Sequence, residues 1–149
     1  MKLTNMRLVL LLLSTTIIFA CSKDEESKSA TDLLTGGSAK SWRIQSRTFN
    51  GTLDPIDSCE ADDFLTFNKS GNTFTDNPGN ITCGASVSSG TWALSSNNKV
   101  LTMTEGGNSN AIDINELSEH KLVLKGNSTD TIMGVPTAYT VVVTLGHVK

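Results

Sequence analysis

From residue 41 onward the chain consists of short runs in which apolar and polar residues alternate. Such alternation places every second side chain on one face of a β-strand, whereas an amphipathic helix repeats every three to four residues. Clusters of Gly, Asn, Asp and Ser separate the runs, and these residues favour turns. The pattern predicts eight strands, over residues 42–48, 63–67, 72–75, 90–95, 100–105, 111–116, 121–125 and 139–145.

The apolar positions of these strands predict a single buried face. In the first strand Trp42 and Ile44 share one face, and Arg43, Gln45 and Arg47 lie on the other. The same alternation predicts an inward-facing set of Ile44, Leu65, Phe67, Leu94, Leu101, Met103, Ile112, Ile114, Leu122, Leu124, Val141 and Val143.

One short helix is expected, over residues 31–35, ended by Gly36 and Gly37. The connections between the strands are mostly short and leave no room for crossover helices. The predicted fold class is therefore all-β, an antiparallel eight-stranded up-and-down barrel, since closure removes exposed strand edges. A flattened sandwich of two sheets is the competing architecture.

The start of the chain is typical of a secretory signal. Lys2 and Arg7 precede an apolar run over residues 8–20, which is too short for a membrane span of about 20 apolar residues. Ala20-Cys21 at the end of this run resembles the lipobox of bacterial lipoproteins. That resemblance implies removal of residues 1–20 and acylation of Cys21, with fatty chains such as palmitate. An ordinary thiol after a conventional signal is the alternative.

Residues 21–30 are polar and strongly charged, which predicts a solvated tether before a domain over residues 31–149. Their Lys-Asp-Glu-Glu run resembles the acidic export tag of surface-exposed lipoproteins in one group of Gram-negative bacteria. The expected location is the cell envelope, as an outer-membrane lipoprotein. Display at the cell surface and retention in the periplasm both stay open.

Cys59 and Cys83 are the two cysteines that remain if Cys21 is acylated. In an oxidising compartment they predict a disulfide that closes a loop of about 25 residues and contributes roughly 3 kcal/mol. The two cysteines follow the first and third strands, so in a meander they lie at the same end, opposite the predicted helix. A metal site is the weaker interpretation, because it needs more thiols or nearby histidines, and His120 and His147 lie far along the chain. His120 is expected in a turn and His147 at a frayed C-terminus.

Composition narrows the function classes. The chain of 149 residues carries a formal charge of −3 with scattered Lys and Arg, so it lacks the basic surface that nucleic-acid binding requires. No Ser-His-Asp arrangement or other catalytic constellation is evident, and we expect neither an enzyme nor a cofactor. An acidic group could offer oxygen ligands to calcium but lacks the spacing of a calcium loop, and solvated charge is favoured for it: Asp54, Asp57, Glu60, Asp62 and Asp63.

The order of motifs along the chain resembles the lipocalin-like domains of bacterial lipoproteins. These motifs are Leu33-Leu34-Thr35-Gly36-Gly37, Lys40-Ser41-Trp42, Cys59-Glu60-Ala61-Asp62-Asp63 before Leu65-Thr66-Phe67, Cys83, Gly90-Thr91-Trp92, Leu101-Thr102-Met103, and Leu117 before His120-Lys121-Leu122-Val123-Leu124. The resemblance implies an eight-stranded barrel closed at one end by a short helix, with Trp42 packed on that helix. The chain departs from the lipocalin Gly-x-Trp motif, because Ala39 to Ser41 separate the glycines from Trp42.

We therefore expect a lipid-anchored barrel that holds a small apolar or amphipathic ligand. The candidate ligand-binding residues are Trp42, Ile44, Phe67, Trp92, Met103 and Tyr139. An eight-stranded barrel either fills its interior with side chains or encloses one small ligand, and both outcomes are open for these residues. The alternative is a non-enzymatic subunit that docks with another envelope protein through a strand face or the Cys59–Cys83 rim.

Overall fold

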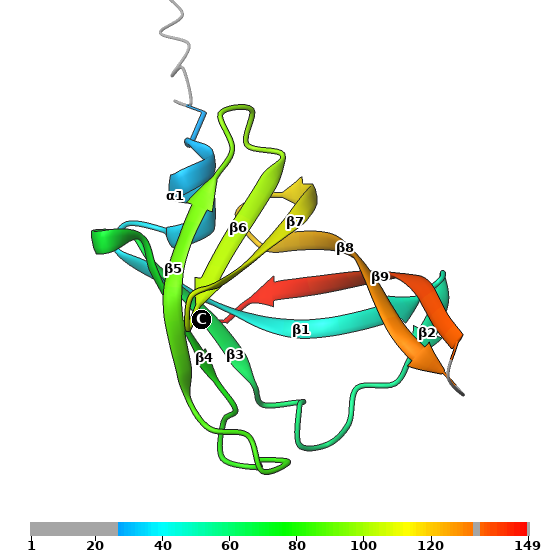
Figure 1. The fold of residues 1–149 in the computed structure, drawn as a ribbon. Coiled ribbons are helices and arrows are strands. Elements are labelled where there is room, and N and C mark those ends of the chain that lie inside the picture. The colour runs from blue at the N-terminus through cyan, green and yellow to red at the C-terminus, as the bar shows by residue number, and fades with distance from the viewer. Residues whose placement is uncertain (1–26, 133–134, 149) are drawn as a thin grey trace, which may run out of the picture.

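The computed structural model describes residues 27–132 and 135–148 (Figure 1). The predicted signal peptide, the predicted acylation site Cys21 and most of the predicted tether lie outside the described residues. Within the described part, no helix has the length and apolar character needed to cross a membrane.

The described chain is all-β apart from one short α-helix and one 3-10 turn. The elements are α1 (Ala30–Thr35), β1 (Ala39–Phe49), β2 (Thr52–Asp54), β3 (Phe64–Asn68), β4 (Thr73–Asn77), β5 (Ser88–Leu94), β6 (Val100–Glu105), β7 (Asn108–Leu117), β8 (Lys121–Ile132) and β9 (Val135–His147). Strands β3 to β9 pair antiparallel in chain order, and β1 pairs with both β3 and β9. The pairing of β1 with β9 closes an eight-stranded barrel. The predicted fold class is therefore confirmed, and the competing two-sheet sandwich is not the observed architecture.

The ninth strand, β2, was missed by the sequence prediction. It forms a hairpin with the end of β1, in which Phe49 pairs with Thr52 across a two-residue turn. Asn50 and Gly51 occupy that turn with φ angles of 49° and 80°. Asn-Gly is the strongest short-range hairpin signal in a sequence, because both residues adopt positive φ at low cost. The sequence therefore contains a hairpin signal at Asn50-Gly51.

A β-bulge in β1 reverses the predicted orientation of Arg47. Ile44 pairs with Leu145 and Arg47 pairs with Val143, so the pairing with β9 skips one residue at Gln45. Side chains after the bulge change face, because a bulge adds one residue to one strand only. Arg47 consequently lies on the inner face with Val143, and its expected outward position is wrong.

Helix α1 covers one end of the barrel, which we call the closed end (Figure 1). Ser29 caps the helix by accepting a hydrogen bond from the Asp32 N–H at 3.1 Å. Trp42 and Leu34 are fully buried, and the indole N–H of Trp42 donates to the Leu34 carbonyl at 2.9 Å. The Trp42 position that the resemblance implied is thus the observed one.

Two polar residues complete the closed end. The Lys40 ammonium is buried and donates to the carbonyls of Leu33 and Glu119 at 2.8 and 2.6 Å. His147 is part of β9, and its N–H donates to the His120 carbonyl at 3.2 Å. The expectation of a frayed end at His147 is therefore wrong, because pairing with β1 holds it against Trp42.

The hydrophobic core lies inside the barrel and includes Leu34 of α1. Its buried members are Leu34, Trp42, Phe67, Phe74, Trp92, Leu101, Ile114, Leu122, Leu124 and Leu145, with Leu65, Leu94, Met103, Ile112, Leu117 and Val143 packed against them. Phe67 and Trp92 meet edge to face at 6.1 Å between ring centroids. Most of the predicted inward set belongs to this core, and Phe74 is a member that the prediction did not include.

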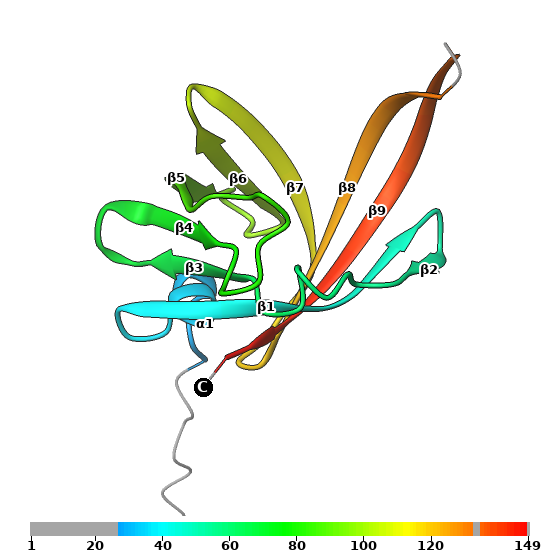
Figure 2. The same cartoon turned by 90° about the horizontal axis from the view of Figure 1, so that it is seen from below.

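Strands β7 and β8 diverge away from the closed end (Figure 2). They pair only from Asp113–Lys125 to Leu117–Leu122. Beyond that point, residues 108–112 pair with β6 and residues 126–132 pair with β9. The barrel wall is therefore continuous near α1 and splayed at the opposite end, which we call the open end.

Candidate functional site

A cavity of about 190 Å³ lies inside the barrel toward the open end. Its lining residues are Trp42, Ile44, Glu60, Asp63, Phe64, Leu65, Asp76, Val143 and Leu145. They come from β1, β3, β4, β9 and the connection between β2 and β3. The cavity therefore borders the core, because Trp42 and Leu145 belong to both.

Strand register explains why these residues meet. Trp42 pairs with Leu65 and Ile44 pairs with Leu145, so residues of three strands share the inner face. Trp42, Ile44, Leu65, Val143 and Leu145 form the apolar floor of the cavity. Leu65 in turn pairs with Asp76, which places a carboxyl on the same inner face beside this floor.

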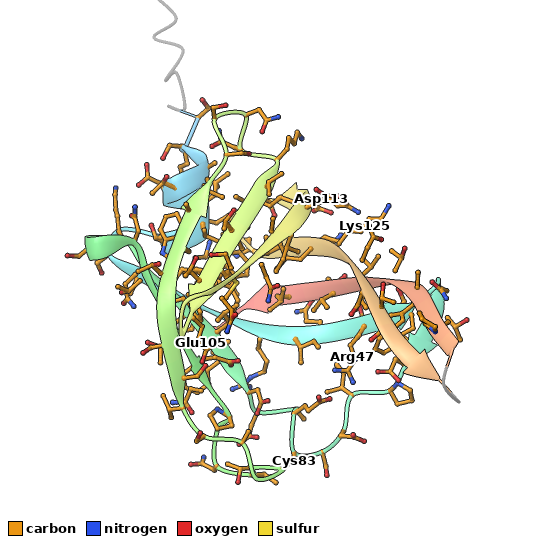
Figure 3. The ribbon with its side chains drawn as sticks, viewed as in Figure 1. Arg47, Cys83, Glu105, Asp113 and Lys125 are labelled. Carbon is orange, nitrogen blue, oxygen red and sulfur yellow. A yellow bond between two sulfur atoms is a disulfide. The ribbon has the colours of Figure 1, made fainter. Side chains whose placement is uncertain are left out.

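A second, more polar depression of about 490 Å³ lies on the wall formed by β6 and β7. It is lined by Met103, Glu105, Gly106, Asn108, Asn110 and Ile112. Figure 3 shows Glu105 at the end of β6 and Arg47 on β1 on either side of the open end, with Cys83 at the rim below them. Both the cavity and the depression therefore combine apolar side chains with acidic ones.

Arg47 ties the connection between β2 and β3 to the barrel. Its guanidinium donates to Asp54 at 2.6 Å and to both carboxylate oxygens of Glu60 at 3.1 Å. This bidentate pair lowers the pKa of Glu60, and hydrogen bonding to Glu60 raises the pKa of Arg47. Asp54 and Glu60 are therefore both paired with the same cation, Arg47.

Two other carboxyls of the cavity lack such a partner. Burial raises the pKa of Asp63, with further repulsion from Asp62 and Glu60. Partial burial also raises the pKa of Asp76, and the charges of Asp63 and Glu105 add to the effect. Asp76 itself lines the first cavity and not the second depression.

The rim beside the cavity is held by covalent and polar links. A disulfide joins Cys59 and Cys83 with 5.6 Å between their Cα atoms, which confirms the predicted pairing at the end opposite α1. The Asp62 carboxylate accepts hydrogen bonds from the N–H groups of Asn80 and Ile81 at 2.7 and 3.3 Å. These bonds lower the pKa of Asp62. The disulfide and these hydrogen bonds therefore hold the β2–β3 and β4–β5 connections together.

The candidate ligand-binding residues occupy different parts of the barrel. Trp42 and Ile44 line the first cavity, and Met103 lines the second depression. Phe67 and Trp92 are buried in the core, where they contact each other. The ring of Tyr139 lies edge-on to Phe49 at 5.5 Å.

The acidic group that was compared with a calcium site is divided among separate roles. Asp54 and Glu60 bind Arg47, Asp62 holds the rim, and Asp63 lines the cavity. Three of the five carboxylates, those of Asp54, Glu60 and Asp62, thus accept hydrogen bonds within the protein. Among the residues that the structure describes, no three His, Cys, Asp or Glu side chains are grouped to hold a metal ion. The sequence did not predict the acidic part of the cavity, because alternation puts Arg47 on the outer face and assigns no face to Asp76.

Comparison with known proteins agrees with the geometry. The sequence profile described as "Lipocalin-like domain" matches residues 39–124. This segment runs from β1 into β8 and contains most of the cavity lining. A search of curated proteins finds no match.

Proposed function

The chain belongs to the lipocalin-like domain family, and on this premise we propose that it binds a small apolar or amphipathic ligand in the cavity at the open end. The observation that carries the proposal is an apolar floor inside the barrel, on which Leu65 and Val143 are only partly buried. Concave sites with apolar walls and a few polar groups are the usual form of small-molecule sites. The cavity adjoins the open end, so a ligand can enter without unfolding the closed end.

Filling the cavity should weaken binding. Val143 lies on the inner face of β9 and forms part of the apolar floor. In Val143→Phe the larger side chain occupies the space in which a ligand would lie, and we expect about a tenfold rise in the Kd of the neutral probe 1-octanol, equivalent to ~1.4 kcal/mol. Titration of the probe at constant protein concentration measures this change.

The neighbouring residue offers a matched control. Val142 lies on the outer face of the same strand, opposite Lys125. Val142→Phe makes the same substitution outside the barrel and should leave the Kd of the probe unchanged. If both variants raised the Kd of the probe equally, or if neither raised it, the probe would bind elsewhere and the proposal would be contradicted.

The alternative, docking with another envelope protein, would use the rim instead. Ile81 and Val87 flank Cys83 and are 56% and 59% exposed. Replacing both with Ser should leave probe binding intact if the cavity is the site. A partner that copurifies with the wild type and with Val143→Phe, but not with the Ile81→Ser/Val87→Ser variant, would favour the docking function.

We further propose that the mature protein is anchored in the cell envelope through an acylated Cys21. The order Lys2, Arg7, an apolar run and Ala20-Cys21 supports this proposal. Two or more acyl chains hold a protein stably on a membrane, whereas one chain does so only marginally. Since α1 is the first described element and lies at the closed end, this anchor would leave the open end directed away from the membrane.

Substitution of Cys21 should release the protein. In Cys21→Ser no thiol is available for acylation, so we expect loss of labelled palmitate and transfer from the membrane fraction to the soluble fraction. Cys59→Ser/Cys83→Ser keeps Cys21 and should retain the label. Incorporation of palmitate into Cys21→Ser at the wild-type level would refute the anchor.

A further inference from the structure

The charges around the cavity are strongly one-sided. The ionisable groups on its lining and at its edge are Arg47, Asp54, Glu60, Asp63, Asp76 and Glu105. Arg47 is the single cation among these six, and its guanidinium is already bound to Asp54 and Glu60. The interior at the open end therefore has an excess of negative charge beside an apolar floor.

Two carboxyls are not neutralised by any described residue. The Oδ1 atom of Asp63 is buried and accepts no hydrogen bond from the described part of the chain. Asp76 faces Leu65 from the adjacent strand and stays accessible to solvent, so an entering ligand can reach it. A buried carboxylate oxygen without a donor is costly, and proteins retain few of them without a reason.

We propose that the ligand carries a cationic head group, in the simplest case an alkylammonium, which lies between Asp63 and Asp76 while its chain covers the apolar floor. This inference rests on the proposed ligand binding in the barrel and specifies the class of ligand. An ammonium has three N–H donors and can donate to the carboxylates of Asp63 and Asp76, both of which line the cavity. An anionic head group at the same place would be repelled.

The energetics of the two carboxyls agree with this assignment. Burial raises the pKa of Asp63 and of Asp76, so the folded protein without a cation holds their ionised forms unfavourably. A carboxyl whose pKa is raised on folding makes the fold more stable as pH falls through that raised value, and less stable once it is ionised. Near neutral pH the ionised form of Asp63 is therefore held unfavourably until a cation neutralises it, whereas solvent screens the charge of the exposed Asp76.

The shape of the cavity limits the size of the ligand. Its volume is about 190 Å³, below the ~300–1,000 Å³ that is usual for drug-sized ligands. A short linear chain with one charged end satisfies both the volume and the position of the carboxyls at the edge of the floor. The structure thus favours a small alkylamine over a bulky polycyclic cation.

Three probes with the same chain and different head groups test the inference: n-octylamine, 1-octanol and octanoate. Isothermal titration near pH 7 should show octylamine binding about tenfold more tightly than octanol, and octanoate more weakly than octanol, because one charge-assisted hydrogen bond contributes roughly that much. Higher salt should narrow the gap between octylamine and octanol.

Three variants show which carboxyls are responsible. Asp63→Asn and Asp76→Asn should each reduce the preference for octylamine while leaving octanol binding unchanged, and should melt at or above the wild-type temperature near neutral pH. Asp113→Asn is the matched control, because Asp113 is exposed and pairs with Lys125 away from the cavity lining (Figure 3). It should retain the full preference for octylamine.

The outcomes separate the two proposals. Equal affinity for octanol and octylamine would overturn the cationic head group and leave ligand binding in place. Failure of all three probes to bind would overturn both proposals. A preference for octylamine that survives Asp63→Asn and Asp76→Asn would place the amine at another site and also refute the inference.

Discussion

Trp42→Ala should destabilise the protein by about 3–5 kcal/mol, the range for truncation of a large buried aromatic side chain. Trp42 is fully buried between α1 and the barrel, and its indole N–H donates to the Leu34 carbonyl at 2.9 Å. Truncation removes the contact of β1 with the helix and leaves the Leu34 carbonyl without its donor. Urea unfolding followed by circular dichroism measures the free-energy change.

Two further substitutions separate the contributions of Trp42. Trp42→Phe retains an aromatic ring and loses the N–H. We expect it to lower the free energy of unfolding by less than Trp42→Ala does, on the order of 1–3 kcal/mol, because the Leu34 carbonyl is left without a donor and packing is reduced. Leu53→Ala on β2 is a control, since Leu53 is 67% exposed and should cost less than about 0.5 kcal/mol. A Trp42→Ala protein as stable as Leu53→Ala would refute the role of Trp42 at the closed end.

Removal of the disulfide has the second largest expected effect. Cys59 and Cys83 are 24 residues apart, and a cross-link of this span stabilises a fold by about 3 kcal/mol by restricting the unfolded chain. Cys59→Ser/Cys83→Ser should therefore unfold at a lower urea concentration than the oxidised wild type. The hydrogen bonds from Asn80 and Ile81 to Asp62 still join the two connections, so we expect the barrel itself to persist.

The reduced wild-type protein is the control for this variant. Reduction breaks the same bond without changing the side chains elsewhere, and the reduced wild type and the double variant should have coincident unfolding curves. An oxidised wild type that unfolds at the same urea concentration as the double variant would show that the disulfide contributes no stability.

Much of the barrel could be predicted because its signals are local. Alternation identified the eight strands of the barrel, since each strand has one face toward the core and one toward solvent. The disulfide followed from the meander, in which connections after the first and third predicted strands share one end. The Asn50-Gly51 turn is a local signal of the same kind, although the eight predicted strands do not include the hairpin that it forms.

The site was harder to predict because it depends on pairing between distant segments. The inward position of Arg47 results from a bulge at Gln45, which is defined by the register of β1 against β9, nearly 100 residues later in the chain. Asp76 lies one residue beyond the predicted end of its strand, so alternation assigned it no face. Its position opposite Leu65 became evident only from the register of β3 and β4.

Titration of methyl-labelled protein with 1-octanol, followed by NMR, tests the ligand-binding cavity most directly. The account predicts saturable shifts of the methyl groups of Ile44, Leu65, Val143 and Leu145, all of which line the cavity. The exposed methyl groups of Leu53, Ile81 and Val87 should stay unperturbed. Saturable shifts confined to those three exposed residues, or no saturable shift at any methyl group, would contradict ligand binding in the cavity.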